Sequence, residues 1–124
     1  VMAKVSRFVR PEVVRLPLSG EDWIEVKREL TVGEQRAAMA RTVKTMRSDG
    51  RFEPDLAMIG KSEVVAYLVD WSFTGEDDKP VKCSADAIDS LTVDTYDEIE
   101  KAIQSHIKRV EDERKNAMSG TSSS

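Results

Sequence analysis

The chain has 124 residues, of which 40% are apolar and 34% charged, and its net charge at neutral pH is −4. This length usually gives one domain, and the apolar content is sufficient for a core without disulfides or structural metals. The acidic balance argues against a general affinity for nucleic acid or anionic membranes. Because only 6% of the residues are aromatic, the composition favours a helical protein with an aliphatic core.

Charge is distributed unevenly along the sequence. Residues 31–52 carry a net charge of +3, and residues 74–100 carry −7. Such segments are usually solvated helix faces, and they can also steer charged partners. The single cysteine, Cys83, has no second cysteine for a disulfide, and the most apolar window, 56–73, is interrupted by charged residues. We therefore expect a soluble, intracellular protein that does not span a membrane.

The N-terminal residues 1–11 alternate apolar and basic types and end at Pro11, which indicates a flexible arm. Apolar residues then alternate on both sides of the turn-forming residues 19–22, which predicts a β-hairpin. Pro17 lies inside the first strand of this hairpin. Because proline has no N–H to donate, that strand is expected at the edge of a sheet.

A capping box at Thr31 and Glu34 predicts the start of a helix. Val32, Met39, Val43 and Met46 follow at near-helical spacing, and Asp49-Gly50 supplies a stop. We therefore expect one helix from Thr31 to about Met46, with most of its basic residues off the apolar face.

A second helix is predicted from Pro54 to about Phe73, because proline is favoured at the first helical position. Its later half is apolar nearly all round, as expected for a central buried helix. Four residues of this helix are predicted to be largely buried, namely Val64, Tyr67, Leu68 and Trp71. They are expected to pack against Val43, Ile99 and Ile103.

The C-terminal part of the sequence predicts a turn at residues 74–80, a short extended piece at 81–83 and two further helices. The first is short and capped by Ser84 or a neighbour. The second starts at Thr92 or Asp94, and its apolar stripe comprises Ile99, Ile103, His106 and Val110. The fold class predicted is mostly α, a single helical domain with an N-terminal hairpin over residues 12–116, followed by a disordered tail over 117–124.

Residues that could carry chemistry stand singly. His106 is the only histidine and lies on an apolar stripe, so a core histidine is expected rather than a catalytic base. Cys83 lies in an acidic segment, where carboxylates raise a thiol pKa and disfavour the thiolate. The carboxylates of residues 76–78 suggest calcium, but the twelve-residue loop with alternate ligands is missing. We therefore assign no catalytic, cofactor-binding or metal-binding residues, expect no cofactor, and do not expect an enzyme.

Two surfaces remain that could contact macromolecules. The basic helix expected around residues 36–51 could contact phosphates, but it lacks interleaved aromatic residues. Methionine side chains are flexible and polarisable and suit adaptable contacts, although core packing also accounts for them. The protein is therefore expected to work by binding other proteins.

Several segments occur in an order that resembles a known family, and they centre on an aliphatic-Asp-Trp-Ser sequence. These segments are Leu30-Thr31-Val32-Gly33-Glu34, Val64-Val65-Ala66-Tyr67-Leu68-Val69-Asp70-Trp71-Ser72-Phe73, Lys79-Pro80-Val81, Ile88-Asp89-Ser90-Leu91 and Thr95-Tyr96-Asp97-Glu98-Ile99. In element order and apolar pattern, residues 12–115 resemble the tail assembly chaperones of long-tailed bacteriophages and prophages.

The resemblance implies a non-enzymatic factor in the host cell cytoplasm. Such a factor binds the tape measure protein, a long apolar-rich helical chain, and keeps it soluble while tail tube protein polymerises around it. A frameshifted longer form that recruits tail tube protein is implied as well, and a homo-oligomer is compatible with the sequence. A helix-binding chaperone needs apolar grooves and a charged exterior.

Two alternatives remain open at this stage. The first is a structural virion component, such as a tail terminator or head-tail joining protein, although those folds usually carry more strand than the sequence predicts here. The second is a small nucleic-acid-binding regulator that uses the basic helix, which steeply salt-dependent DNA binding would reveal.

Overall fold

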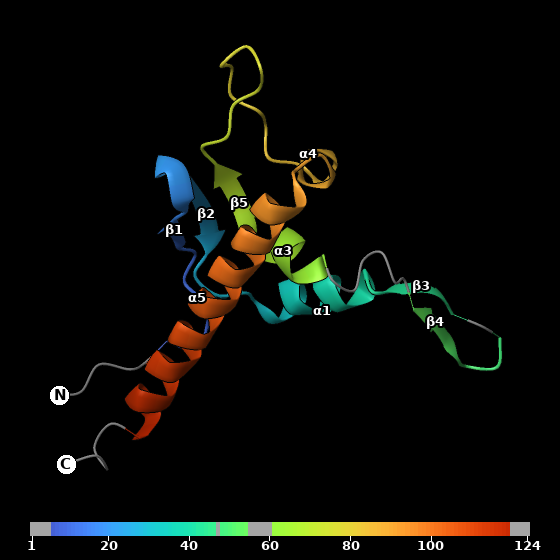
Figure 1. Cartoon of the computed structure of the whole chain (residues 1–124). Coiled ribbons are helices and arrows are strands. Elements are labelled where there is room, and N and C mark those ends of the chain that lie inside the picture. Colours follow the sequence, from blue (N-terminus) through green and yellow to red (C-terminus); the bar gives the residue numbers. More distant parts are fainter. Residues whose placement is uncertain (1–5, 47, 55–60, 120–124) are drawn as a thin grey trace.

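The computed structural model describes residues 6–46, 48–54 and 61–119. It shows an α+β domain, so the prediction of a mostly helical fold is wrong: 48% is helix and 19% is strand. Strands β1, β2 and β5 form a three-stranded antiparallel sheet, and β3 pairs with β4 (Figure 1). The elements are β1 Val13–Pro17, β2 Trp23–Lys27, α1 Val32–Ala40, β3 Val43–Met46, β4 Phe52–Pro54, α3 Ser62–Tyr67, β5 Leu68–Trp71, α4 Ala85–Asp89 and α5 Val93–Ser119.

The predicted N-terminal hairpin is confirmed. β1 and β2 pair in the antiparallel register that places Leu16 opposite Ile24. A short 3-10 turn at Ser19–Glu21 connects them, and it contains Gly20 at φ +67°, a conformation that glycine adopts without steric cost. In the sheet order β1-β2-β5, β1 lies at an edge, where Pro17 was expected.

The core lies between this sheet and α5, which crosses one face of it (Figure 1). Ile24 and Val26 of β2 are fully buried, and Ile99 and Ile103 of α5 meet them from the other side. The predicted stripe of α5 is confirmed as buried over its whole length, through His106 to Val110. On the opposite face of the sheet, the Arg15 guanidinium lies 3.8 Å from the centre of the Trp23 ring.

The first predicted helix is shorter than expected. Its capping box is confirmed, because the Thr31 side chain accepts from the Glu34 backbone N–H while the Glu34 carboxylate accepts from Thr31. However, α1 ends at Ala40, and a turn at Arg41 and the β-branched Thr42 leads into β3, which starts at Val43. Asp49-Gly50 is therefore not a helix stop but part of the connection between β3 and β4, with Gly50 at φ +84°.

The second predicted helix is two different elements. Pro54 ends β4 instead of starting a helix, residues 55–60 lie outside the described part, and α3 covers only Ser62–Tyr67. Residues 68–71 continue as β5, which pairs with β2 and places Trp71 opposite Ile24. Pairing with β2 satisfies backbone groups along this edge, which a helix at the same place would leave unpaired.

The predicted core contacts are confirmed in part. Val64 and Trp71 are buried in one cluster with Ile99 and Ile103, and Tyr67 and Leu68 pack against that cluster. The Trp71 indole also donates to the Val81 carbonyl oxygen at 2.7 Å. Val43 is not part of this core, because it lies on β3.

The C-terminal elements largely follow the prediction. Ser84 caps α4 by accepting from the Ala87 N–H, and α5 starts at Val93. Thr74 and Pro80 form an isolated bridge that closes the predicted turn, whereas residues 81–83 form no strand. Parts of the expected arm and tail, residues 1–5 and 120–124, lie outside the described chain.

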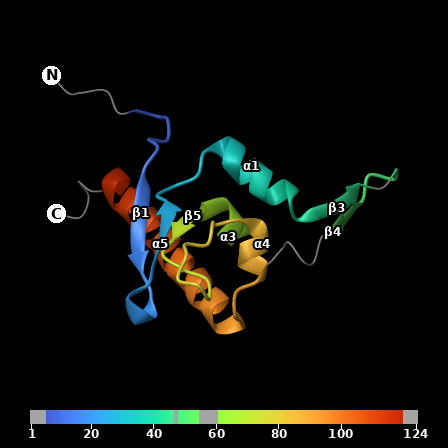
Figure 2. The same ribbon diagram turned by 90° about the horizontal axis from the view of Figure 1, so that it is seen from above.

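The β3–β4 ribbon extends away from the rest of the domain, as two perpendicular views show (Figures 1 and 2). The two strands pair with each other, and neither joins the main sheet. Within the described ranges, the helices are too short or too polar to cross a membrane.

Candidate functional site

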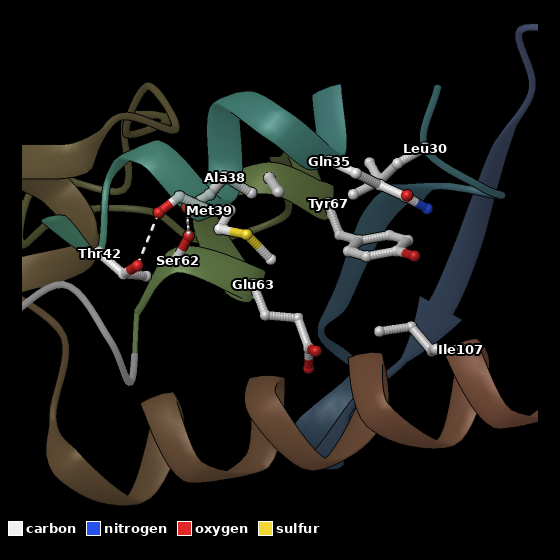
Figure 3. Close-up of a pocket in the computed structure, with 10 residues that line it drawn as sticks. Leu30, Gln35, Ala38, Met39, Thr42, Ser62, Glu63, Tyr67 and Ile107 are labelled. Atoms are coloured by element: carbon white, nitrogen blue, oxygen red, sulfur yellow. Dashed lines mark hydrogen bonds between the residues drawn. The ribbon is translucent and has the colours of Figure 1, made fainter. Parts of the chain in front are cut away.

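An open groove with a volume of about 400 Å³ lies where α1, α3 and α5 meet (Figure 3). α1 and α3 contribute most of its walls, and α5 contributes Ile107. The lining is mainly apolar and consists of Leu30, Gln35, Ala38, Met39, Thr42, Ser62, Glu63, Ala66, Tyr67 and Ile107. Binding sites are typically concave and mostly apolar, with a few polar groups, and this groove has that character.

One hydrogen bond joins the two short helices of the groove, and a second closes the end of α1. Ser62 is buried on α3, and its hydroxyl donates to the Ala38 carbonyl oxygen of α1. At the end of α1, the Thr42 hydroxyl donates to the Met39 carbonyl oxygen at 2.6 Å (Figure 3). These bonds satisfy carbonyl groups near the helix end, where intrahelical partners are missing. These two hydrogen bonds therefore fix the position of α3 against α1 and the end of α1, which together form the groove walls.

The α1 wall leaves unusually large apolar side chains uncovered. Helix α1 contains no buried residue, and Met39 in the groove is 73% exposed. Val32, at the start of the same helix, is 63% exposed. Single exposed apolar residues are common on protein surfaces, but two such residues on one short helix beside an apolar groove favour an interaction surface.

The floor of the groove contains the polar groups that would orient a bound segment. Glu63 extends from α3 in the direction of α5, and the Tyr67 ring lies between Leu30 and Ile107 (Figure 3). Burial raises the pKa of Tyr67, and the Glu63 carboxylate raises it further, so the phenol stays protonated and can donate a hydrogen bond. The Tyr67 ring also packs edge-to-face on His106, with ring centres 6.3 Å apart.

Acidic residues border the groove on its α5 side. Burial raises the pKa of Glu63 above its usual value, and Glu100 of α5 raises it further. The pKa of Tyr96 is also raised, first by burial and then by Glu100 and Asp89. Like charges close together oppose ionisation, so the carboxylates of Glu63 on α3 and Glu100 on α5 repel each other.

His106 has a structural position, as the sequence predicted. It is 2% exposed, and its Nε2 lies 2.9 Å from the Arg28 carbonyl oxygen and 3.2 Å from that of Lys27. The Arg109 guanidinium donates to Nδ1 at 3.2 Å. With these partners Nε2 acts as the donor and Nδ1 as the acceptor. His106 therefore ties α5 to the end of β2.

Cys83 and the acidic turn at residues 76–78 do not come together with the groove. Cys83 is half-buried, and burial, followed by the nearby Asp70, raises its thiol pKa. In the turn, the Asp77 carboxylate accepts from the Lys79 N–H and lies 3.9 Å from its ammonium. Over the ranges that the structure describes, no three potential metal ligands of the His, Cys, Asp or Glu type cluster.

The basic segment does not form the single helix face that was expected. Arg36 lies on α1, Arg41 caps its end, and Arg51 lies in the ribbon beside Asp49, at 3.8 Å. Arg47 falls outside the described residues. The basic residues are thus divided between two elements, which removes the helix on which the nucleic-acid alternative relied.

Sequence reasoning did not identify the groove. The sequence indicates only that methionines such as Met39 suit adaptable contacts, and it gives no signal for Ala38, Ser62 and Glu63. The groove arises from the contact between α1 and α3, which lie 24 residues apart at Ala38 and Ser62. Comparison of the chain with protein-family models, with curated proteins and with solved structures finds no match in any of the three.

Proposed function

We propose that this protein is a tail assembly chaperone of a long-tailed bacteriophage or prophage and that it binds the tape measure protein through the α1–α3–α5 groove. The observation that carries this proposal is the open apolar groove beside the exposed Met39 and Val32. The resemblance of residues 12–115 to that family supplies the identity of the client.

The groove suits the binding of an amphipathic helix. In this mode of recognition, side chains at every third or fourth position of a helix enter an apolar groove on the partner. The client is long, helical and rich in apolar residues, so its surplus surface matches the lining of Leu30, Ala66 and Ile107. Covering this surface would keep the client soluble until tail tube protein replaces the chaperone.

Co-expression with the tape measure protein of the same genome tests the proposal. We expect the client to be soluble with this protein, insoluble without it, and recovered in complex from the lysate. Met39→Ser should weaken the complex about 10- to 150-fold, because burying a methionine contributes roughly 1.5–3 kcal/mol. Val93→Ser is the matched control, since Val93 is also exposed, at 75%, and is not part of the groove lining.

Two results would contradict the proposal. One is a client that is equally soluble alone and forms no complex. The other is an equal loss of binding in Met39→Ser and Val93→Ser, which would separate binding from the groove. Added salt should weaken the complex only modestly, because burial of apolar surface does not depend on charge screening.

A structural virion component is the second candidate. The expected scarcity of strand argued against it, and the three-stranded sheet removes that argument. Mass spectrometry of purified particles separates the two functions. A chaperone leaves before the tail is complete and should be missing from the particles, whereas a terminator or joining protein should be present in a fixed ratio to the tail tube.

A further inference from the structure

We propose that the groove prefers helical segments that carry a lysine or arginine beside their apolar face, and that Glu63 and Glu100 receive this cation. The inference rests on the proposed function in one respect, since the client segment is taken to be a helix. The inference adds that the bound segment carries a positive charge, which burial of apolar surface alone does not require.

The positions of the two carboxylates follow from the helices that carry them. Glu63 lines the groove on α3, and its side chain extends in the direction of α5 (Figure 3). Glu100 lies on α5, seven positions before the groove residue Ile107, which corresponds to two turns along the same helix face. A segment that contacts Ile107 and Tyr67 and runs along α5 towards its N-terminal end would therefore pass both carboxylates.

Neither carboxylate is neutralised by a cation within the described part of the chain. The neighbouring Lys61 is already engaged, because its ammonium lies 2.8 Å from the Asp89 carboxylate. Other glutamates of this domain do have cationic partners, as Glu113 has in Arg28 at 2.9 Å. Glu63 and Glu100 thus form a site of uncompensated negative charge at the border of an apolar groove.

A bound helix would change the free energy of this site according to its charge. Covering Glu63 with an apolar segment removes water from a carboxylate that is already partly desolvated and repelled by Glu100. Without a partner, this desolvation opposes binding, whereas a lysine or arginine compensates for it with a charge-assisted hydrogen bond. A client glutamate would add a third negative charge and should bind weakest.

Fluorescent helical peptides provide the direct test with the full chain. The probes are peptides with leucine at helical spacing along one face, varied in register, that differ only in one residue beside this face, which is Arg, Gln or Glu. We expect the Arg peptide to bind about 2- to 5-fold more tightly than the Gln peptide, as for a partly exposed ion pair, and the Glu peptide to bind weakest.

Paired variants identify the groups responsible. Glu63→Gln together with Glu100→Gln should abolish the preference for Arg over Gln. The matched control, Glu76→Gln with Asp77→Asn, removes the same charge from the distant turn and should leave the preference intact. Circular dichroism and thermal unfolding of each variant verify that the fold is retained.

Three results with the peptides would overturn the inference. They are equal binding of the Arg and Gln peptides, a preference that survives in the Glu63/Glu100 variant, and no binding by any peptide. Self-association that is lost in Met39→Ser would also overturn it, because a second copy would then occupy the groove. Solubilisation of the tape measure protein is a separate readout, so the charge preference can fail while the proposed function holds.

Discussion

Replacement of His106 by leucine should destabilise the domain, because the histidine has a structural role. The ring is 2% exposed and its Nε2 is shared by the carbonyl oxygens of Lys27 and Arg28. Leucine is of similar size but cannot donate, so the two carbonyl groups lose a buried donor. The cost of such a loss is roughly 1–3 kcal/mol.

The contact between His106 and Tyr67 adds to this cost. Their rings meet edge-to-face at 6.3 Å and an interplanar angle of 81°. Such pairs contribute about 0.5–1.5 kcal/mol beyond area burial. Arg109 is exposed and can turn to water, so losing its bond to Nδ1 should cost little. We therefore expect His106→Leu to lower the free energy of unfolding by roughly 2–4 kcal/mol, out of a typical total of about 5–15 kcal/mol.

Urea unfolding followed by tryptophan fluorescence measures this effect. The midpoint should fall while the slope with denaturant stays the same, since the surface exposed on unfolding does not change. His106→Gln retains a donor and should lose about 1 kcal/mol or less, and Lys108→Ala on the exposed side of α5 should change stability by at most about 0.5 kcal/mol. A His106→Leu protein as stable as the unmodified chain would refute the role given to the carbonyl contacts. Loss of client binding by a stable His106→Gln protein would reopen a functional role.

The remaining predictions concern three positions. Trp71→Ala should lower the free energy of unfolding by roughly 3–5 kcal/mol, because the side chain is 5% exposed, and an unchanged melting temperature would remove Trp71 from the core. Cys83→Ser should leave client binding intact, and Cys83 should react with iodoacetamide more slowly than free cysteine, since burial raises its pKa. Glu34→Gln should cost about 0.5–1 kcal/mol in urea unfolding at neutral pH. Lys27 and the Thr31 N–H lower the pKa of Glu34 from 4.5 to about 2. The contribution of Glu34 to the free energy of unfolding is therefore complete above pH 4.5 and is lost as the pH falls towards 2. If the stability of Glu34→Gln falls with acid as much as that of the unmodified chain, this prediction is contradicted.

Local signals in the sequence were reliable where the interaction they describe is itself local. The capping box at Thr31 and Glu34 and the Ser84 cap each join groups three residues apart, and both are present. The stripe of α5 depends only on helical periodicity, and its residues Ile99, Ile103, His106 and Val110 are buried as expected. The hairpin of β1 and β2 likewise needs only alternation and a short turn.

The strand β5 could not be recognised in this way. The run from Val64 to Trp71 is apolar, and a buried helix and a buried strand share that composition. The choice depends on β2, more than 40 residues earlier, whose free edge pairs with residues 68–71. Val69 and Asp70 of β5 are exposed, on the face of the sheet that α5 does not cover. In the predicted helix, these two residues would have lain next to its buried face.

The β3–β4 ribbon was missed for a different reason. Asp-Gly is among the strongest hairpin signals when alternating residues flank it, and Asp49-Gly50 was interpreted only as the end of a helix. Alanines at positions 37, 38 and 40 favoured that interpretation, since they have a high helix propensity. Propensity agrees with a helix up to Ala40, and the β-branched Thr42 and Val43 that follow have a lower helix propensity.

Both of these misplaced helix ends border the groove, and this explains why the groove exists. If the helices had run from Thr31 to Met46 and from Pro54 to Phe73, they would have been long enough to cover each other's apolar faces. Instead α1 ends at Ala40 and α3 covers only Ser62–Tyr67, and the Ser62–Ala38 hydrogen bond joins the two short helices. Met39 is left exposed and Tyr67 half-covered beside α5. The chain thus leaves apolar helix surface open to a partner because the backbone on either side is committed to strands.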